Sequence, residues 1–266
     1  MDKPLFYRIN VWIAEELKDY APNLFKYKKQ FGDSGSATVE MFWKAGLIAF
    51  VIGLLLGVLL VVTKRDGIRK NLIIYHITNT LVNVFRSIPF IILLIFLIPY
   101  TRAIVGTAIK VKGAIMPLVF GTVPFYTRQV EVALSGVEEG KIEAARSMGS
   151  STLGLIFRVY LPEAIPALIR VTTVTAISLI GLTTMAGAVG AGGLGAFAIN
   201  YGQNQSHEDI VNVCVIVLLI VTIIFQSIGN GLSRLTHNRK LITIRHGRTP
   251  EKTVLPVDTP ESDVAQ

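Results

Sequence analysis

The chain has 266 residues, of which 51% are hydrophobic and only 17% are charged, whereas about a quarter of the residues in soluble domains are charged. This composition excludes a disordered chain and argues against a soluble enzyme. The 26 Lys and Arg residues exceed the 18 Asp and Glu residues and give a net charge of +8. Because the basic residues adjoin apolar runs, we interpret them as markers of membrane topology and expect no nucleic-acid partner.

Two runs without Asp, Glu, Lys or Arg are long enough to cross a bilayer. They cover residues 45–63 and 211–233, and a helix of about 20 apolar residues spans the hydrocarbon layer. We therefore predict an all-α membrane protein with five transmembrane helices. The predicted spans lie at about residues 42–63, 71–100, 113–134, 164–189 and 210–232, within a transmembrane domain at residues 41–235.

The segments outside this domain are predicted from their composition. Residues 1–40 place apolar side chains at helical spacing between charges, which predicts an amphipathic helix lying in the membrane interface. Residues 236–266 are basic and then rich in proline and polar residues, which predicts a disordered tail. The four histidines and the one cysteine, Cys214, lack the spacing of metal ligands, so we expect no metal site.

The second predicted span is longer than a bilayer requires. Residues 71–100 would form a helix about 45 Å long, so its first half should protrude or pack inside the bundle. Four polar side chains share one face of this helix and would be costly facing lipid; they are His76, Asn79, Asn83 and Arg86. Arg86 is either a pathway charge or the structural partner of an inward-facing carbonyl or acid. We favour the structural role, with Asn83 or Ser87 helping to solvate the guanidinium.

The region after the fourth span is rich in glycine. No charged residue occurs between Arg170 and Glu208, an interval too long for one span and too short for two spans with a loop. We predict a span followed by a broken or re-entrant segment lining a cavity. Residues 190–195 match G-x-G-x-x-G, but no strand precedes them and Val215 stands near the place of the ribose-binding acid. A dinucleotide site is therefore not expected.

Two other glycine patterns have simple interpretations. Gly53 and Gly57 form a G-x-x-x-G motif that permits close helix approach. The approaching helix can belong to the same chain or to another copy, and we slightly favour the same chain. Gly140 and Lys141 do not open a phosphate loop, because Ile142 replaces the required Ser or Thr. Any ATP that this protein uses must therefore bind to another chain.

The basic residues indicate an orientation. Fifteen Lys and Arg residues lie in residues 64–70, 128–170 and the tail, against ten in residues 1–44, 101–112 and 190–209. Positive residues favour the cytoplasmic side of a membrane. We therefore predict an amino terminus outside the cell and a cytoplasmic carboxyl terminus.

The predicted cytoplasmic loop at residues 135–163 has a helix–glycine–helix pattern. Residues 141–148 are good helix formers, and Gly149 can adopt the positive φ that ends a helix. Ser150 or Ser151 can cap a second helix, which Pro162 should interrupt before the fourth span. From the residues alone, this segment is equally well a docking element or a solvated connector.

The same loop resembles a known signature. Residues Glu143, Ala144, Ala145, Gly149, Val159, Leu161 and Pro162 fit the pattern E-A-A-x-x-x-G, nine residues, an aliphatic residue, any residue, L-P. This is similar to the coupling loop in the membrane subunits of bacterial ABC importers, with Val159 where isoleucine is usual. Residues 85–94, 98–107 and 185–195 resemble the permeases of the methionine-uptake type. The resemblance covers residues 35–235 and departs at both ends of the chain.

The resemblance implies a type I importer permease with cytoplasmic coupling helices, in the bacterial inner membrane. It implies a homodimer in the lipid bilayer, two ABC ATPase subunits beneath it, and an extracytoplasmic substrate-binding protein or lipoprotein above it. The permease would bind no cofactor and catalyse no reaction, since ATP and Mg would sit on the ATPase. The implied substrate is an amino acid, first L-methionine and then D-methionine. Another small amino acid or a short peptide is the alternative.

The resemblance also assigns residue roles. Glu143, Ala144, Ala145, Gly149, Leu161 and Pro162 would form the ATPase-coupling site. A path or gate would involve Ser178, Thr183, Thr184 and Met185 of the fourth span. Hydroxyl groups in membrane helices often bond their own backbone, so Met185 is the strongest candidate, because a flexible thioether can close and reopen a narrow path.

Two other classes of protein fit less well. A membrane enzyme would need paired ionisable or nucleophilic residues inside the bilayer, and the first and fifth spans contain none. An ATP-independent secondary transporter usually has internal repeats and ion-coupling groups, and five spans do not divide into two repeats.

Overall fold

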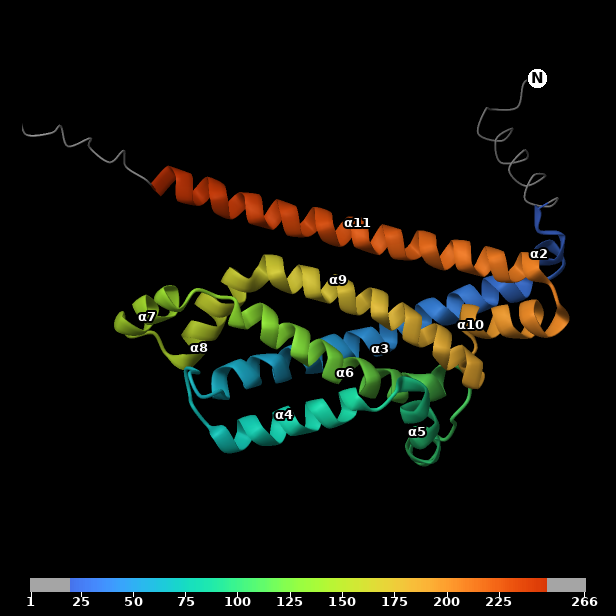
Figure 1. The fold of residues 1–266 in the computed structure, drawn as a ribbon, viewed down its shortest axis with the longest axis horizontal. Coiled ribbons are helices and arrows are strands. Elements are labelled where there is room, and N and C mark those ends of the chain that lie inside the picture. The colour runs from blue at the N-terminus through green and yellow to red at the C-terminus, as the bar shows by residue number, and fades with distance from the viewer. Residues whose placement is uncertain (1–19, 248–266) are drawn as a thin grey trace, which may run out of the picture.

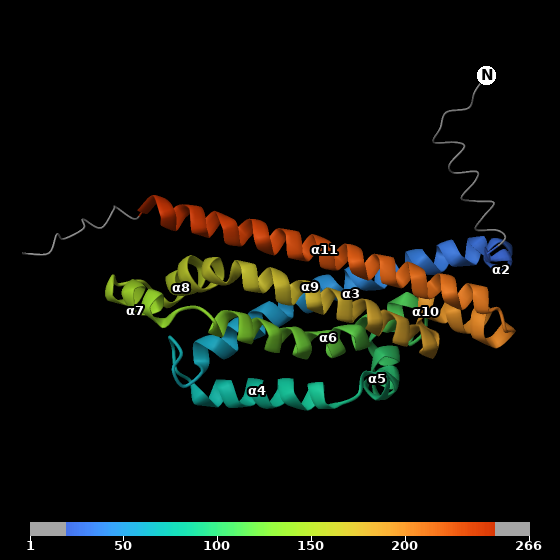
Figure 2. The same cartoon turned by 45° about the horizontal axis from the view of Figure 1, so that its top comes forward.

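The computed structural model describes residues 20–247, with side chains to residue 236. Every regular element among these residues is helical, and the long helices lie side by side along the length of the molecule (Figure 1, Figure 2). The four longest are α3 (Lys28–Thr63), α6 (Lys110–Ser135), α9 (Leu161–Ala186) and α11 (Glu208–Gly247). α6 and α9 form the centre of the bundle, with α3 packed on both of them and α11 along α9.

Shorter elements connect these helices. They are α2 (Pro22–Lys26), α4 (Leu72–Ser87), α5 (Phe90–Val105), α7 (Glu139–Ser147), α8 (Thr152–Leu155) and α10 (Gly193–Phe197). Three π-helical segments lie at Ile156–Tyr160, Gly187–Ala191 and Ala198–Gly202, and a 3-10 turn lies at Gln203–Gln205.

Several of these helices have the length and composition of membrane spans. Within the described residues, three continuous helical stretches qualify, at Lys28–Thr63, Thr152–Ala191 and Glu208–Thr236, and α4 with α5 qualifies as a bent pair. α6 has 26 residues, which is long enough to cross a bilayer, but it is not among the helices that qualify by hydropathy and charge. The all-α membrane fold is confirmed, and the count of five spans stays a prediction.

The second predicted span is not one helix. α4 and α5 meet at an angle of 106°, so the continuous helix of about 45 Å expected from the sequence is wrong. Pro89 explains the break, because a proline disfavours helical backbone in the residue before it. Ile88 is extended accordingly, with φ −83° and ψ 122°.

Helices run past both ends of the predicted transmembrane domain, whose bounds stay a prediction. α3 begins at Lys28, so the predicted boundary at residue 40 falls inside a continuous helix. α11 continues to Gly247, so the first part of the predicted disordered tail is helical; no proline interrupts the sequence before Pro250. The remainder of the predicted amphipathic segment, residues 1–19, and of the tail, residues 248–266, lies outside the described residues.

Side chains of α6 pack directly onto the backbone of α3 at two glycines. A β-carbon at Gly53 would lie 2.7 Å from Tyr126 Cδ1, and one at Gly57 would lie 2.5 Å from Val130 Cγ1. The G-x-x-x-G motif therefore serves packing within the chain, the interpretation slightly favoured from the sequence. Tyr126 also donates or accepts a hydrogen bond of 2.7 Å with Thr172 of α9, which ties the third long helix to this contact.

The glycine-rich segment is broken, as predicted, but it is packed rather than cavity-lining. Gly190 and Gly192 have positive φ, and the chain then folds back so that α10 lies against α9 and α3. A β-carbon at Gly195 would overlap the Thr184 carbonyl oxygen, and the Leu194 amide donates to Thr38 Oγ1 at 2.8 Å. The space that this segment borders with α5 and α6 is about 10 Å³. The glycines therefore permit a tight turn against neighbouring backbone.

The glycine contact on α6 yields a prediction. Gly57→Ala should destabilise the subunit by about 1–3 kcal/mol, because the added methyl group overlaps Val130 and the backbone beside it. The matched control is Gly32→Ala in the same helix, where a β-carbon meets nothing within 4 Å. Thermal unfolding in detergent is the measurement. An equal or higher unfolding temperature for Gly57→Ala would contradict the packing described for α3 and α6.

Candidate docking and translocation sites

One end of the molecule collects the basic segments. α7 and α8 lie at the same end as the connection between α3 and α4 and the carboxyl-terminal part of α11 (Figure 1, Figure 2). α2 and the turn that precedes α11 lie at the opposite end. The structure therefore groups the three segments whose positive charge predicted a cytoplasmic location.

α7 ends in a turn that requires glycine. Gly149 has φ +79°, its amide donates to the Arg146 carbonyl at 2.9 Å, and the Ser150 amide donates to the Ala145 carbonyl at 3.1 Å. This pair of hydrogen bonds is the Schellman arrangement, which satisfies the last carbonyls of a helix. A β-carbon at Gly149 would meet nothing within 4 Å, so the requirement for glycine here is one of backbone conformation alone.

The segment after this turn differs from prediction at one point. Ser151 caps α8, and its hydroxyl oxygen accepts from the Gly154 amide at 3.2 Å, as expected for one of the two candidate caps. Pro162 does not interrupt the helix. The π-helical segment before it, closed by the Leu161 amide donating to the Ile156 carbonyl, accommodates the proline near the first turn of α9, where a missing N–H costs little. Residues 152–191 are therefore helical, with a kink at Val189 and Gly190.

Three large apolar side chains are exposed at this end. Met148, Leu153 and Phe157 are 79%, 66% and 64% exposed. Glu143 and Ala144 of α7 are exposed beside them, whereas Ala145 is buried. Exposed apolar side chains gathered on a polar, basic end of a membrane protein indicate a surface for another protein. We call the exposed residues of α7, together with these three apolar residues, the docking surface.

Sequence reasoning found only part of the docking surface. It identified the α7 residues, because they carry the E-A-A pattern. It missed Met148, Leu153 and Phe157, although their polar surroundings in the sequence distinguished them from the apolar residues of the spans.

α7 is tied to the start of α9. Lys141 Nζ lies 3.1 Å from a carboxylate oxygen of Glu163 and 3.4 Å from one of Glu138. The hydrogen bond to Glu163 raises the pKa of Lys141 above its usual value. Such an exposed pair contributes at most about 1 kcal/mol. It nevertheless adds a second connection between α7 and α9, beside the covalent one through Gly149.

One face of α9 is uncovered. Exposed residues recur at helical spacing along it: Val174, Ser178, Gly181, Met185 and Ala188. Met185 is 52% exposed. Thr183 is buried and its hydroxyl donates to the Ile180 carbonyl at 2.7 Å, while Thr184 is half-buried and donates to the same carbonyl at 3.1 Å. The geometry therefore brings Ser178 and Met185 to the open face and places Thr183 in the packed core.

A cavity adjoins this face. Its volume is about 330 Å³ and it lies under the bend between α4 and α5, against α6 and α9. Its lining is mainly apolar, with Arg86, Thr122 and Ser178 as the side chains that carry polar groups. The chain therefore places Arg86 of the second predicted span and Ser178 of the fourth around one space.

The predicted partners of Arg86 are wrong. The Asn83 amide oxygen accepts a hydrogen bond of 2.8 Å from Arg128 of α6, and the Asn79 amide oxygen accepts one of 2.7 Å from the same guanidinium. Arg128 also pairs with Glu131, one turn away. The Ser87 hydroxyl donates to its own backbone. The sequence carried a signal for this cluster, since an Arg and an acid three residues apart in the third span need polar neighbours.

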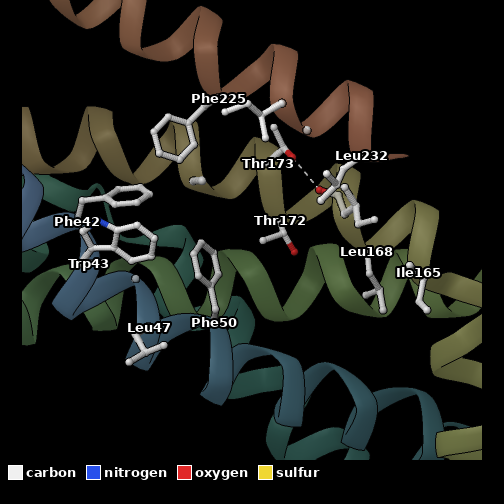
Figure 3. Close-up of a pocket in the computed structure, with 15 residues that line it drawn as sticks. Phe42, Trp43, Leu47, Phe50, Ile165, Leu168, Thr172, Thr173, Phe225 and Leu232 are labelled. Atoms are coloured by element: carbon white, nitrogen blue, oxygen red, sulfur yellow. Dashed lines mark hydrogen bonds between the residues drawn. The ribbon is translucent and has the colours of Figure 1, made fainter. Parts of the chain in front are cut away.

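A larger space between α3, α9 and α11 has a different character. It has a volume of about 410 Å³ and is lined by apolar and aromatic side chains, among them Phe42, Phe50 and Phe225 (Figure 3). Its two hydroxyl groups are already bonded, Thr172 to Tyr126 and Thr173 to the Ile169 carbonyl. This groove offers no charge, and the indole N–H of Trp43 is its hydrogen-bonding group without a recorded partner within the described chain, so it fits lipid contact better than substrate contact.

Comparison with known proteins agrees with this geometry. Residues 41–241 match the family described as binding-protein-dependent transport system inner membrane component. The methionine import system permease protein MetP of Bacillus subtilis is 45% identical over 181 residues, which are 68% of this chain and 82% of that protein. The D-methionine transport system permease protein MetI of Escherichia coli is 48% identical over 138 residues, 52% of this chain and 64% of that protein.

Solved structures give the same result. A structure of the MetNI methionine ABC transporter in an inward-facing conformation matches with a TM-score of 0.77 at 41% identity, over 79% of this chain and 98% of that chain. An amino acid ABC transporter matches with a TM-score of 0.66 at 18% identity, over 79% of this chain and 96% of that chain, which supports the fold alone. The helical bundle, the docking surface at its basic end and these matches together place the chain in the family of binding-protein-dependent transport system inner membrane components.

Proposed function

We propose that this chain is the permease subunit of an ATP-driven importer and forms the membrane path for methionine. The observation that carries the proposal is the docking surface on α7 and the start of α9, in a chain 41% identical to a chain of a solved methionine ABC transporter. Another small amino acid or a short peptide remains the alternative substrate.

The structure supports a mechanical role for the docking surface. Two ATPase subunits, which would bind ATP and Mg, would each seat one copy of α7, with Glu143, Ala144 and Ala145 at the contact. Movement of α7 reaches α9 through the Gly149 turn and through the contact between Lys141 and Glu163. Because residues 152–191 are one helical stretch, displacement at its inner end is carried toward the gate region. Leu161 and Pro162 stand where that stretch begins to cross the membrane.

The path itself requires a second copy of the chain. The face of α9 with Ser178 and Met185 is open in one subunit, and two such faces meeting across a dimer axis would enclose a path. An extracytoplasmic binding protein or lipoprotein would deliver the substrate at the end that carries α2 and α10. ATP binding and the docked binding protein would then select the outward-facing state from an existing equilibrium.

Uptake assays and co-purification with the ATPase test this function directly. The chain expressed with its ATPase and binding protein should restore uptake of labelled L-methionine to cells that lack their own transporter. It should also co-purify with the ATPase. Uptake that is independent of the ATPase would instead identify a secondary transporter. Preferential uptake of a different amino acid or a peptide would identify that compound, rather than methionine, as the substrate.

The orientation gives one prediction. A reporter fused after Arg239 should be active only in the cytoplasm, and one placed before Asp33 only outside the cell, because the basic segments gather at the carboxyl-terminal end of the bundle. Paired alkaline phosphatase and fluorescent-protein fusions measure this. Two fusions reporting the same side would contradict an odd number of spans.

The docking surface gives a second prediction. Gly149→Val should cost the turn on the order of 1 kcal/mol or more, because a β-branched residue resists positive φ. Glu143→Lys should reverse a charge at the ATPase contact. Both variants should reach the membrane and lose transport-coupled ATP hydrolysis. Gly149→Asn is the matched control, since Asn tolerates the left-handed region, and it should retain most coupling. Normal uptake by Gly149→Val and Glu143→Lys would remove the coupling role.

A third prediction concerns Met185. If Met185 belongs to a gate, Met185→Ala should leak substrate or hydrolyse ATP without the binding protein, while its unfolding temperature changes little because the side chain is half exposed. Leu179→Ala, at a fully buried position of the same helix, is the control and should lower stability by about 2–5 kcal/mol without a leak.

Thiol labelling provides an independent measurement of this gate. Met185→Cys in a Cys214→Ser background should react with a small polar reagent from outside in one nucleotide state and be protected in the other. Equal labelling in both states, with a large loss of stability for Met185→Ala, would place Met185 in a packed interface.

A further inference from the structure

Arg86 is an intramembrane cation that the rest of the described chain leaves unpaired. It is exposed in the last turn of α4 and lines the 330 Å³ cavity. Within residues 20–236 the structure records no hydrogen bond or ion pair for its guanidinium, because Asn79, Asn83 and Glu131 are all engaged by Arg128. A charge at such a position normally pairs with an acid, a carbonyl or a solute.

A second polar group lines the same cavity. Ser178 is exposed on the open face of α9, and within the described residues its hydroxyl has no recorded hydrogen bond. Thr122 of α6 also borders the cavity, but it is 1% exposed and its unbonded hydroxyl is enclosed by protein, as is that of Thr127 outside the cavity. The hydroxyl that a ligand in the cavity can reach is therefore that of Ser178.

The remaining walls of the cavity are apolar and aromatic. Phe90 and Phe125 line it from α5 and α6, and Leu182 lines it from α9. Aromatic rings make favourable contacts with thioether sulfur. The cavity thus combines one cation and one accessible hydroxyl group with an apolar surface, which are the groups needed to hold a carboxylate and an uncharged side chain of one small molecule.

The depth of Arg86 in the membrane determines which kinds of anion can reach its guanidinium. α4 rises about 21 Å from Leu72 to Arg86 at roughly 1.5 Å per residue, and the hydrocarbon layer is about 30 Å thick. With Leu72 near the inner interface, as the proposed orientation requires, the guanidinium lies past the middle of the membrane. Lipid phosphates remain at the interfaces, so the anion that reaches Arg86 is carried by a solute in the path.

We propose that Arg86, with Ser178, forms a substrate station inside the permease that binds the carboxylate of the transported amino acid. This site deepens the proposed function and rests on it. The guanidinium holds the carboxylate through charge-assisted hydrogen bonds, and the side chain of the substrate lies against Phe90 and Phe125. Recognition is directed at the carboxylate, because none of the residues lining the cavity is acidic, so the ammonium group of the substrate meets no opposite charge there.

Equilibrium binding to the assembled permease and ATPase tests the site without the binding protein. The complex is placed in nanodiscs of phosphatidylcholine, and labelled L-methionine is the ligand. Methioninamide, which lacks the carboxylate, should compete at least about tenfold more weakly than methionine. Arg86→Gln should weaken binding by about tenfold or more, Arg86→Lys less, and Ser178→Ala a few fold. Arg102→Gln, at an exposed arginine of α5 outside the cavity, should bind as the wild type does.

The outcomes separate this site from the function on which it rests. Suppose that the wild-type complex imports methionine with its binding protein. If it then binds no methionine in nanodiscs, or binds methioninamide as tightly as methionine, the substrate station is overturned and the importer function stands. Unchanged binding by Arg86→Gln has the same consequence. Wild-type complex that imports no methionine overturns the proposed function. If Arg86→Gln fails to assemble, Arg86→Lys and the methioninamide competition decide. Binding that is seen in phosphatidylcholine nanodiscs but is lost when anionic lipids are added would show that an anionic lipid head group competes for Arg86 and would overturn the depth argument.

Discussion

Close backbone approach at glycine is the contact on which the bundle depends. Helices in a bilayer gain no hydrophobic stabilisation from leaving lipid, so their association rests on packing and hydrogen bonds. α3 meets α6 where Gly53 and Gly57 present no side chain, and α11 meets α9 where a β-carbon at Gly229 would overlap the side chain of Thr173. These two contacts fix α3 and α11 on separate faces of the central pair. The side chains of Tyr126 and Thr172 then join the two central helices.

This arrangement decides which surface is left for transport. α3 and α11 cover two faces of α9, and the face with Ser178 and Met185 remains open beside the cavity under the α4–α5 bend. Within the described chain, the lipid-side groove between α3, α9 and α11 has no charged group and only the indole N–H of Trp43 without a recorded partner, whereas the cavity has a guanidinium and the exposed hydroxyl of Ser178. The distribution of polar groups, rather than volume, therefore distinguishes the path from the membrane face.

The sequence predicted local features well and partner choice poorly. Gly149 at a positive φ, the Ser151 cap and the break in the glycine-rich segment follow from local backbone chemistry, which a short stretch of sequence contains. The bend at Pro89 was also encoded locally, but the apolar run around it favoured a continuous span. Pairing of Asn83 with Arg128 instead of Arg86 depends on which helices are neighbours. Periodicity places residues on a face but does not say which helix that face meets.

The bend at Pro89 links the fold to the chemistry of the cavity. A straight helix over residues 71–100 would continue past α6, whereas the turn of 106° carries α5 away and leaves the cavity beneath it. The same break ends α4 just after Arg86, so the guanidinium sits at a helix carboxyl terminus, where the dipole favours a cation. The electric field of the helix dipole stabilises the positive charge of Arg86 without occupying the hydrogen-bond donors of its guanidinium. A fixed acidic partner would compete with a passing carboxylate, whereas a helix terminus leaves the hydrogen-bond donors of Arg86 available.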